Sequence, residues 1–549
     1  MKTMKRALSI VLCVILAGVF SACSDAGGQG TGDRVSGGSN ATDTVQSTAA
    51  DETLPAEKDY SEKMTISLAT VQIQDGKDYT NGDDLTRHFT EKFNLQWDIT
   101  SLTWENWAER LRVWINSDDM PDMVVWDYKH GEAVTYAEQG LVKQLPEGWK
   151  DNYPHLAKAY GDTVMNTGVE EQLGGTFFLF RPVFSANRPA DKLSHHMSAY
   201  LRQDWADAVG CELKDAMKWS EIIEYAKLVK EQDPGHVGAN FYPIVIRSNN
   251  IYTVQSNSTY AGILGSPFYL GEDGQYQWGG ASEDTLTGLK LYSQMYREGL
   301  LHPEFYTLQD PDDVSTFYVA GTSAVIFAEG MANPMQRMAK EMETNLGLDY
   351  DKAVRPVALL GEDGNYHGAA VTNFWCANAF SPNIEDAKLE RLLDMIDYSC
   401  TDEGQRYIRM GLEGVDWEMG SDGEYKSLLP EGDILNDKYA IHPVYGNLMI
   451  LSDDFQFINP SLESKYREKT KALYQTREKL STEESLPSEP DWTIQFYSST
   501  ALNLATMTYT DEYASIVTKE GDIEENWKAW VAEKNNIINP VLDELNALN

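Results

Sequence analysis

The segment MTISLAT (residues 64–70) alternates apolar and polar side chains as a β-strand does. An apolar stripe at helical spacing follows over residues 84–93, and residues 95–102 again have the pattern of a strand. A second helical stripe ends near Asn116, and after a Pro-Asp break comes the short apolar segment MVVW (residues 123–126). Strands that alternate with helices at this spacing pair in parallel. The pattern therefore predicts an α/β layer fold.

The chain has 549 residues, which is too many for one compact core, so we expect two or more lobes. It contains 85 Asp and Glu against 45 Lys and Arg, a formal net charge of −40. Such a surface repels phosphate backbones and anionic lipid, which argues against nucleic acid as a partner. Further helices are expected at residues 220–232, 282–298 and 384–399 and from residue 523 onward.

The first 22 residues are organised like a secretory signal peptide, with a basic start and an apolar run over residues 7–20. Ser21-Ala22-Cys23 follows, and a cysteine directly after small residues resembles a bacterial lipobox, in which that cysteine is acylated and becomes the new N-terminus. Phe20 departs from the leucine that is usual at its position. We predict lipidation of Cys23; the alternative is an ordinary signal peptide.

Residues 23–62 are rich in Gly, Ser, Thr, Asp and Ala and have almost no large apolar residue before Leu54. Such a segment cannot bury enough surface to fold, so it is expected to be a flexible tether with a reach of ~35 Å. No later stretch of the sequence is apolar enough to span a bilayer. The lipid would then be the only membrane anchor.

Motifs for metal or catalytic chemistry are scarce. Cys211, Cys376 and Cys400 lack CxxC spacing, so they predict no zinc site and at most one disulfide, with free thiols as the alternative. HExxH, GxSxG, P-loop and GxGxxG motifs are absent from the sequence. The adjacent pair His195-His196 is a weak metal candidate, because neighbouring side chains on a strand or helix face apart. Asp-Gly pairs, such as Asp273-Gly274, predict hairpin turns rather than calcium loops.

Four segments resemble, in order, motifs of the extracellular solute-binding proteins of ABC sugar importers. The closest group is the large lipoprotein subfamily that includes the alginate-oligosaccharide-binding proteins. The segments are NSDDMPDMV (116–124), EQGLVKQL (138–145), YLRQDWADAVG (200–210) and TDEGQ with GLEGVDW (401–417). The end of the chain from Trp527 also resembles the closing helix of this subfamily, so the resemblance extends from about Met64 to the C-terminus.

The resemblance implies two α/β lobes joined by crossing segments, which close over a ligand like a hinge. The implied N-terminal lobe consists of residues 63–185 and 373–445, and the C-terminal lobe of residues 186–372 and 446–549. The cleft would lie at the carboxyl ends of the strands. Crossings are expected near residues 184–200, 371–380 and 441–460.

One segment departs from the family pattern. Relatives often carry a calcium loop after the helix that corresponds to residues 220–230. Here the segment DPGHVGANFYP (233–243) keeps only Asp233 and Asn240 as oxygen ligands, whereas calcium takes six to eight. We therefore predict no bound calcium at this place, and no other metal or cofactor.

Sugars offer apolar C–H faces and a rim of hydroxyls, which suit aromatic planes and polar side chains in a largely pre-formed pocket. Trp126, Asp127 and Tyr128 end a strand and are the first candidates for ligand contacts, with a core position as the alternative for Trp126. Trp107 and Trp205 are expected in the core. Further candidates lie near the implied crossings or in the fourth motif: Arg181, Asn187, Arg188, Asn373, Trp375 and Trp417. Solvent exposure is the alternative for the three that border the first crossing, and a core position is the alternative for Trp375.

These features together predict a monomeric, lipid-anchored receptor on the outer side of the cell envelope. It would capture an oligosaccharide and deliver it, unchanged, to the permease subunits of an ABC importer. The first alternative is a secreted polysaccharide-processing enzyme, a hydrolase or lyase. A receptor for peptides or another solute is the second, because a fold does not decide the class of ligand.

Overall fold

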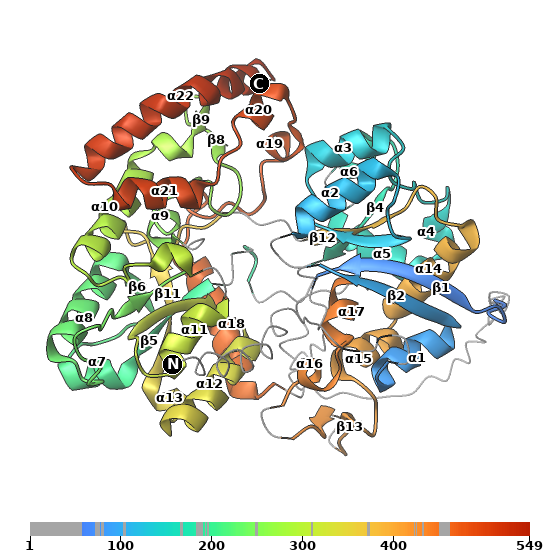
Figure 1. Cartoon of the computed structure of the whole chain (residues 1–549), viewed down its shortest axis with the longest axis horizontal. Coiled ribbons are helices and arrows are strands. Elements are labelled where there is room, and N and C mark those ends of the chain that lie inside the picture. Colours follow the sequence, from blue (N-terminus) through green and yellow to red (C-terminus); the bar gives the residue numbers. More distant parts are fainter. Residues whose placement is uncertain are drawn as a thin grey trace, which may run out of the picture.

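The computed structural model describes most of the chain between residues 58 and 548. The described residues are 58–71, 77, 79, 82–102, 106–164, 168–182, 190–192, 194, 197–247, 251–308, 311–369, 374–421, 423, 425–430, 433–448 and 462–548. Figure 1 shows two lobes side by side, each built around its own five-stranded sheet. The predicted signal peptide, Cys23 and most of the tether lie outside the described residues.

The sheet of the N-terminal lobe has the strand order β2-β1-β3-β12-β4. Its strands are β1 (Met64–Thr70), β2 (Leu95–Ser101), β3 (Met123–Trp126), β4 (Phe178–Pro182) and β12 (Phe374–Phe380). The first strand is parallel to β2 and β3, as the sequence predicts, whereas β12 runs antiparallel to both β3 and β4. The late strand β12 therefore joins the two parts of this sheet.

Helices cover this sheet, and a small hairpin lies at the lower end of the lobe in Figure 1. The helices are α1 (Asp84–Lys92), α2 (Trp107–Ser117), α3 (His130–Glu138), α4 (Trp149–Asn152), α5 (Pro154–Val164), α6 (Val169–Leu173), α14 (Asp386–Ser399), α15 (Asp402–Met410), α16 (Leu435–Lys438) and α17 (His442–Leu448), and the hairpin strands are β13 (Trp417–Met419) and β14 (Tyr425–Ser427). The side chain of Asp83 accepts a hydrogen bond from the backbone N–H of Thr86 (2.7 Å), which fixes the start of α1.

The sheet of the C-terminal lobe has the order β6-β11-β5-β10-β7. Its strands are β5 (Met197–Arg202), β6 (Ala216–Lys218), β7 (Ile244–Val245), β10 (Val325–Glu329) and β11 (Val354–Leu360). The first of these, β5, is antiparallel to β10 and β11, while β7 and β6 pair in parallel with them. A separate hairpin, β8 (Phe268–Leu270) and β9 (Tyr276–Trp278), turns at the predicted Asp273-Gly274.

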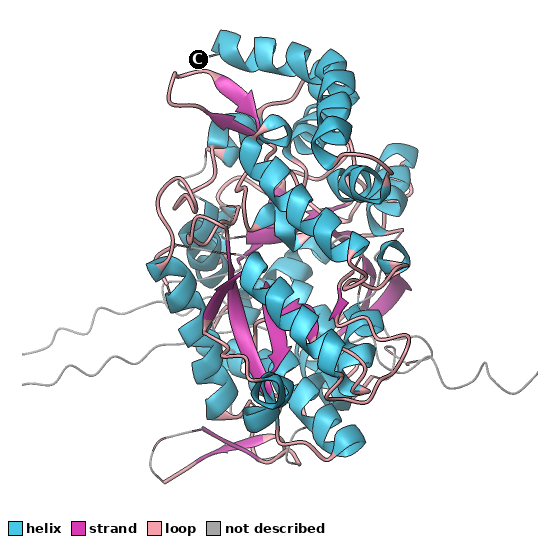
Figure 2. Cartoon of the chain, turned by 90° about the vertical axis from the view of Figure 1, so that its left-hand side faces the viewer, coloured by secondary structure: helices cyan, strands magenta, loops and turns pink. Residues whose placement is uncertain are grey.

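Helices also surround this second sheet, and Figure 2 shows several of them in front of its strands. They are α7 (Gln203–Val209), α8 (Trp219–Gln232), α9 (Tyr252–Gln255), η1 (Gly279–Ala281), α10 (Glu283–Arg297), η2 (Phe305–Thr307), α11 (Pro311–Val319), α12 (Ala332–Leu346), α13 (Tyr350–Ala353), α18 (Ser464–Lys479), α19 (Trp492–Phe496), α20 (Thr500–Leu504), α21 (Tyr509–Thr518) and α22 (Ile523–Leu548). The four later helices predicted from the sequence correspond to α8, α10, α14 and α22. No helix among the described residues has the length and apolar character needed to span a bilayer.

Each lobe has its own apolar core, and each core draws on segments far apart in the sequence. Residues 66–180 and 374–445 supply the core of the N-terminal lobe, and the C-terminal lobe is built around residues 197–359 and 462–545, with which Ile434 also packs. The chain therefore passes between the lobes after β4, after β11 and after α17. Many residues of these three passages lie outside the described residues, so the exact boundaries of the lobes stay a prediction.

His442 begins α17 and is buried in the N-terminal lobe, where its Nδ1 contacts the amide oxygen of Asn436. Burial lowers the pKa of His442 to about 4, whereas an unfolded histidine titrates near ~6.5. As the pH falls, the unfolded chain therefore takes up a proton before the folded one does. We expect the free energy of unfolding to fall by about 2 kcal/mol between about pH 6.5 and 5 through this group.

Urea unfolding at both pH values, for the wild type and for His442→Gln, measures this dependence. The variant should lose about that much of the pH dependence. An identical pH dependence in the two proteins would show that His442 is not the group responsible.

Candidate functional site

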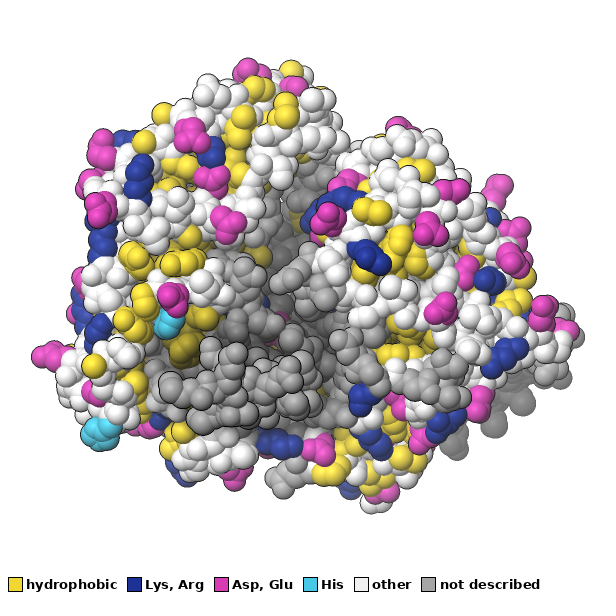
Figure 3. Space-filling model, in the orientation of Figure 1, with side chains coloured by type: hydrophobic (Ala, Val, Ile, Leu, Met, Phe, Trp, Pro, Cys, Tyr) yellow, Lys and Arg dark blue, Asp and Glu magenta, His cyan; other side chains and the backbone are white. Residues whose placement is uncertain are grey.

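Figure 3 shows a hollow between the two lobes. The strand directions explain which residues face it. The chain leaves the N-terminal lobe at the end of β4 and enters the other lobe at the start of β5. Because β5 is antiparallel to β10 and β11, their carboxyl ends lie at the same edge as the start of β5. In the other lobe, β12 is antiparallel to β3, so its start lies beside the carboxyl end of β3. These edges form the two walls of a groove, called here the inter-lobe groove.

The end of β3 brings aromatic side chains to the N-terminal wall of the groove. Tyr128 is partly exposed, and its ring packs edge-on against Phe180 (4.7 Å) and Phe374 (6.1 Å). Burial raises the pKa of its hydroxyl, so Tyr128 stays a neutral hydrogen-bonding group. Asp127, also partly exposed, forms an ion pair with Lys129 (3.2 Å). The structure thus brings both of these predicted residues to the groove.

Trp126, the third residue predicted at this strand end, is only 1 % exposed. Its ring lies among Tyr128 (5.4 Å), Tyr136 (5.6 Å) and Phe178 (5.1 Å), so no face of the indole is open to a ligand in this structure. Trp126 therefore occupies the core position given as its alternative. Trp107 is also buried, as predicted, and its Nε1 donates to the carbonyl oxygen of Val125 (2.7 Å).

A β-bulge positions Trp375 at the start of β12. Trp375 is opposite Arg181 on β4 but Ala377 is opposite Phe180, so Cys376 is an extra residue in the pairing. Cys376 has a φ of 48°, which is uncommon for a residue other than glycine. Bulges occur next to functional sites, where they redirect a side chain. Here the strained residue directly follows Trp375, which supports a functional reason for the orientation of this tryptophan.

Trp375 is partly exposed, and its immediate neighbours hold its ring in place. The ring of Trp107 lies 5.7 Å from it, and the guanidinium of Arg181 lies 5.6 Å from its centroid. Arg181 itself is 1 % exposed, and its Nε donates to the carbonyl oxygen of Gly446 (2.7 Å). Arg181 is thus neither exposed to solvent nor placed to touch a ligand. It packs against Trp375 and links β4 to the end of α17.

Trp417 lies far from the groove, in the small hairpin at the lower end of the N-terminal lobe (Figure 1). It is 3 % exposed, and its Nε1 donates to the carbonyl oxygen of Gly411 (3.1 Å). Its position is that of a structural tryptophan rather than of a ligand contact. The predicted ligand residues Asn187, Arg188 and Asn373 lie outside the described residues, as does the pair His195-His196, and their roles stay predictions.

Charged residues that the sequence analysis did not select line the C-terminal wall. Arg247 follows β7, Glu329 ends β10, and Arg337 and Glu341 lie about one turn apart along α12. These four border a small cavity of about 70 Å³. The rule that selected Tyr128, a polar residue directly after a buried strand, also applies to PIVIR (243–247) and to the glutamate that ends VIFAE (325–329). This rule could have found Arg247 and Glu329.

The helix α19 of the C-terminal part of the chain touches the N-terminal lobe. The ring of Phe496 lies 4.3 Å from that of His130 at the start of α3. Tyr128 donates its hydroxyl proton to Nδ1 of His130 (2.5 Å), and Nε2 donates to the amide oxygen of Gln172 (2.8 Å). Burial lowers the pKa of His130, in keeping with this neutral form. The contact therefore links α19 to the wall residue Tyr128.

The three cysteines in the described part of the chain are free thiols. Burial raises the pKa of Cys376 and of Cys400 to about 12, so neither is a nucleophilic thiolate at neutral pH. Among the residues that the structure describes, no group of three or more His, Cys, Asp or Glu side chains is placed to hold a metal ion.

The segment 233–243 is held by its own backbone and by aromatic packing. The carboxylate of Asp233 accepts hydrogen bonds from the backbone N–H groups of Val237 (2.8 Å) and Gly238 (2.9 Å). Phe241 packs edge-on against the buried Trp205, with the ring centroids 5.7 Å apart. The only carboxylate of this segment is therefore already used by the protein.

We expect this segment to keep its structure without a divalent cation. Addition of excess EDTA should leave the midpoint of thermal unfolding unchanged, because no part of the folding free energy would come from metal binding. The measurement is a thermal melt with EDTA and a parallel melt with added calcium chloride. A midpoint that falls with EDTA and recovers with calcium would contradict the expectation.

Comparisons with known proteins agree with this architecture. No family model matches the chain, and no curated protein is detectably similar to it in sequence. Among solved structures, it is similar to an extracellular solute-binding protein from Bifidobacterium longum subsp. infantis, with a TM-score of 0.63 and 15 % identity over 88 % of this chain and 97 % of that one. It is similar to the alginate-binding protein AlgQ2 without calcium ion, with a TM-score of 0.64 and 14 % identity over 89 % and 98 % of the two chains.

A third match is the substrate-binding protein FusA of an ABC transporter of S. pneumoniae, in complex with kestose, with a TM-score of 0.63 and 15 % identity over 88 % and 98 % of the two chains. At these identities the matches show the fold: the chain has the two-lobed α/β fold of extracellular solute-binding proteins. The predicted fold class and the resemblance to this group are confirmed.

Proposed function

We propose that this protein is the solute-binding receptor of an ABC importer and that it captures an oligosaccharide in the inter-lobe groove. The observation that carries the proposal is that the two walls of the groove present different kinds of side chain. Partly exposed aromatic rings, Tyr128 and Trp375, stand on the N-terminal wall, and charged side chains, Arg247 and Glu329, stand on the opposite wall. A sugar chain between them would meet an aromatic surface on one side and hydrogen-bonding groups on the other.

The two kinds of wall fit the two kinds of surface that a sugar has. The C–H faces of a pyranose are apolar and pack on aromatic rings, which bury area with little loss of side-chain entropy. The hydroxyls pair with guanidinium and carboxylate groups, whose hydrogen bonds are stronger than those between neutral groups. Tyr128 is held by His130, and Trp375 packs against Trp107 and Arg181, so both rings are positioned before a ligand arrives.

The contact of α19 with α3 supports closure of the lobes over the ligand. This contact is small: no residue of α19 is fully buried, although Phe496 reaches the ring of His130. A contact of this size can form and break as the lobes move about their crossings. A ligand that touches both walls binds the closed form better than the open form and therefore shifts the population toward it.

The names of similar structures support the class of ligand. FusA was solved with kestose, NgtS of S. pneumoniae with the N-glycan fragment Man5GlcNAc, and a protein from B. longum infantis is described as binding HMO. None of these names describes an enzyme, which favours a receptor over the hydrolase or lyase alternative. Acylation of Cys23, a position outside the membrane, delivery to a permease and a monomeric state complete the proposal and rest on the sequence.

A thermal-shift screen tests the proposed function. The probes are kestose, high-mannose glycan fragments, milk oligosaccharides and alginate oligosaccharides, with a mixture of short peptides as a further arm. A ligand at a hundred times its Kd should raise the free energy of unfolding by about 2.7 kcal/mol. Chromatography should then recover the sugar intact. Shorter sugar products would favour the enzyme alternative, and a shift with peptides alone would favour the peptide receptor.

A further inference from the structure

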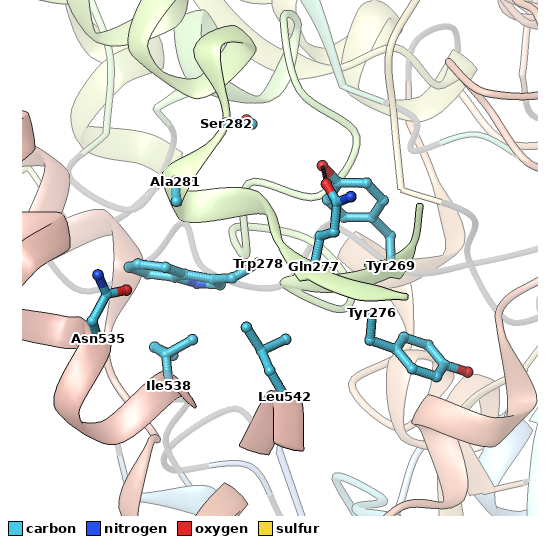
Figure 4. A pocket seen from close by; sticks show the side chains of 9 residues that line it. All are labelled: Tyr269, Tyr276, Gln277, Trp278, Ala281, Ser282, Asn535, Ile538 and Leu542. Carbon is cyan, nitrogen blue, oxygen red and sulfur yellow. Dashed lines mark hydrogen bonds between the residues drawn. The ribbon is translucent and has the colours of Figure 1, made fainter. Parts of the chain in front are cut away.

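We propose that the C-terminal lobe carries a second carbohydrate site, outside the inter-lobe groove, which takes a single neutral sugar residue. The site is a cavity of about 260 Å³ between the β8–β9 hairpin and α22, shown in Figure 4. The hairpin and α22 lie together at the upper end of this lobe in Figure 1. All of its lining residues belong to the C-terminal lobe, so the site does not depend on closure of the lobes.

The size of the cavity suits one sugar ring. Its volume corresponds to that of roughly nine water molecules at ~30 Å³ each, so it is too large to be a site for one ordered water. It is also smaller than the ~300–1,000 Å³ of pockets that enclose drug-sized ligands. A chain of several sugars would not fit, but the terminal residue of a chain would.

The aromatic walls of the cavity are fixed by contacts behind them. The ring of Tyr269 stacks on that of Tyr260, with centroids 4.5 Å apart and planes at 13°. Trp278 is only 4 % exposed, so most of the open aromatic surface belongs to the partly exposed Tyr269. Trp278 donates from Nε1 to the hydroxyl oxygen of Tyr509 (2.9 Å), and Figure 4 shows its indole lying across the cavity above Ile538. Rings that are held in this way lose little freedom when a ligand binds, which favours affinity.

Polar groups stand beside these rings. Gln277 accepts a hydrogen bond at Oε1 from the hydroxyl of Tyr269 (3.0 Å), which fixes the position of its amide. The side chain of Asn535 lines the cavity and is only partly exposed, and it has no hydrogen bond with any described residue. A primary amide carries a donor and an acceptor side by side. Two neighbouring hydroxyls of a sugar present the same pair, so Asn535 is the group that a sugar would satisfy.

The charges around the cavity select a neutral ligand. Asp273 lies in the turn of the hairpin, and Glu283 and Asp284 directly follow the lining residue Ser282. The lysine next to Asn535, Lys534, is paired with Glu512 (2.7 Å). A phosphate or uronate would therefore meet net negative charge at this end of the lobe. An uncharged hexose or N-acetylhexosamine avoids this repulsion.

Saturation-transfer NMR with simple glycosides tests this site. The probes are methyl α-glucopyranoside, methyl α-mannopyranoside, methyl β-galactopyranoside and N-acetylglucosamine at millimolar concentration. Asn535→Ala removes the free amide, and Ala281→Leu places bulk from an exposed position at the edge of the cavity. We expect each change to weaken binding of the preferred probe at least about tenfold, a loss of about 1.4 kcal/mol. Asn536→Ala, an exposed asparagine one position along α22, is the matched control and should bind as the wild type does.

The same titration with Trp375→Ala separates this site from the groove. The second site is supported if the probe still binds to Trp375→Ala and is lost from Asn535→Ala, with thermal melts showing that the variants are folded. A signal that disappears in Trp375→Ala would place the monosaccharide in the groove and overturn the proposal. No signal with any probe, or equal affinities for the two asparagine variants, would also overturn it. The oligosaccharide screen of the groove uses different probes, so either proposal can fail without the other.

Discussion

Trp375→Ala should weaken binding of the oligosaccharide found in the screen by about 30- to 150-fold, a loss of about 2 to 3 kcal/mol. The reason is the position of this ring on the N-terminal wall of the inter-lobe groove. It is partly exposed, packs against Trp107 and Arg181, and directly precedes the bulge at Cys376. An aromatic ring that is already positioned offers its exposed surface to the sugar without an ordering cost. Isothermal titration calorimetry on the wild type and the variant measures the loss.

Trp114→Ala is the matched control for this prediction. Trp114 is a partly exposed tryptophan of the same lobe, about two turns along α2 from Trp107, and it packs with Arg110 (5.0 Å). Its removal should leave the affinity within about twofold of the wild type. Thermal melts must show both variants folded. Equal affinities of Trp375→Ala and wild type would remove Trp375 from the site and with it the main support for an aromatic wall.

Asp416→Ala should lower the free energy of unfolding of the N-terminal lobe by about 3 to 5 kcal/mol. Asp416 is 1 % exposed, and its carboxylate is shared by three partners. It accepts hydrogen bonds from the backbone N–H of Leu412 (2.7 Å) and the hydroxyl of Tyr439 (2.7 Å), and it pairs with Lys438. Alanine would leave the first two donors without an acceptor in the interior. Chemical denaturation followed by circular dichroism measures the change.

The control for Asp416 is Asp386→Ala in the same lobe. Asp386 also pairs with a lysine, Lys143 (2.9 Å), but its side chain is almost fully exposed. The expected loss is below about 1 kcal/mol, because water and ions screen a surface pair. Similar losses in the two variants would show that the carboxylate of Asp416 is not a stabilising centre. The GLEGVDW motif that contains it would then need another explanation.

The sequence predicted the fold well because its signals are local. The alternation in residues 64–70 and the apolar run at residues 123–126 follow directly from the faces of a sheet, and β1 and β3 lie there. The rule that selects a polar residue directly after a buried strand also found Tyr128. It could not separate Tyr128 from Trp126, because burial of Trp126 depends on Phe178, which is distant in the sequence.

The remaining site residues depend on long-range contacts. The hydrogen bond from Arg181 to Gly446 joins residues that are far apart in the sequence, and it gives this predicted ligand residue a structural position. The bond from Trp417 to Gly411 is local, but no sequence pattern reveals it. The contact of Phe496 with His130 joins residues from opposite ends of the chain. Glu329 could have been predicted from the sequence, because it is a polar residue at the end of a buried strand, as Tyr128 is.

The place of β12 in the first sheet bears on the order in which the protein can form during synthesis. This strand lies between β3 and β4, yet it is made after the whole first part of the C-terminal lobe. Until it emerges, the nascent chain holds the two halves of that sheet with unpaired edges facing each other, and such edges are prone to aggregate. The sheet of the N-terminal lobe, whose first strands are made early, is therefore completed only after β12 has been made. Pairing of strands across such a long intervening segment is intrinsically slow.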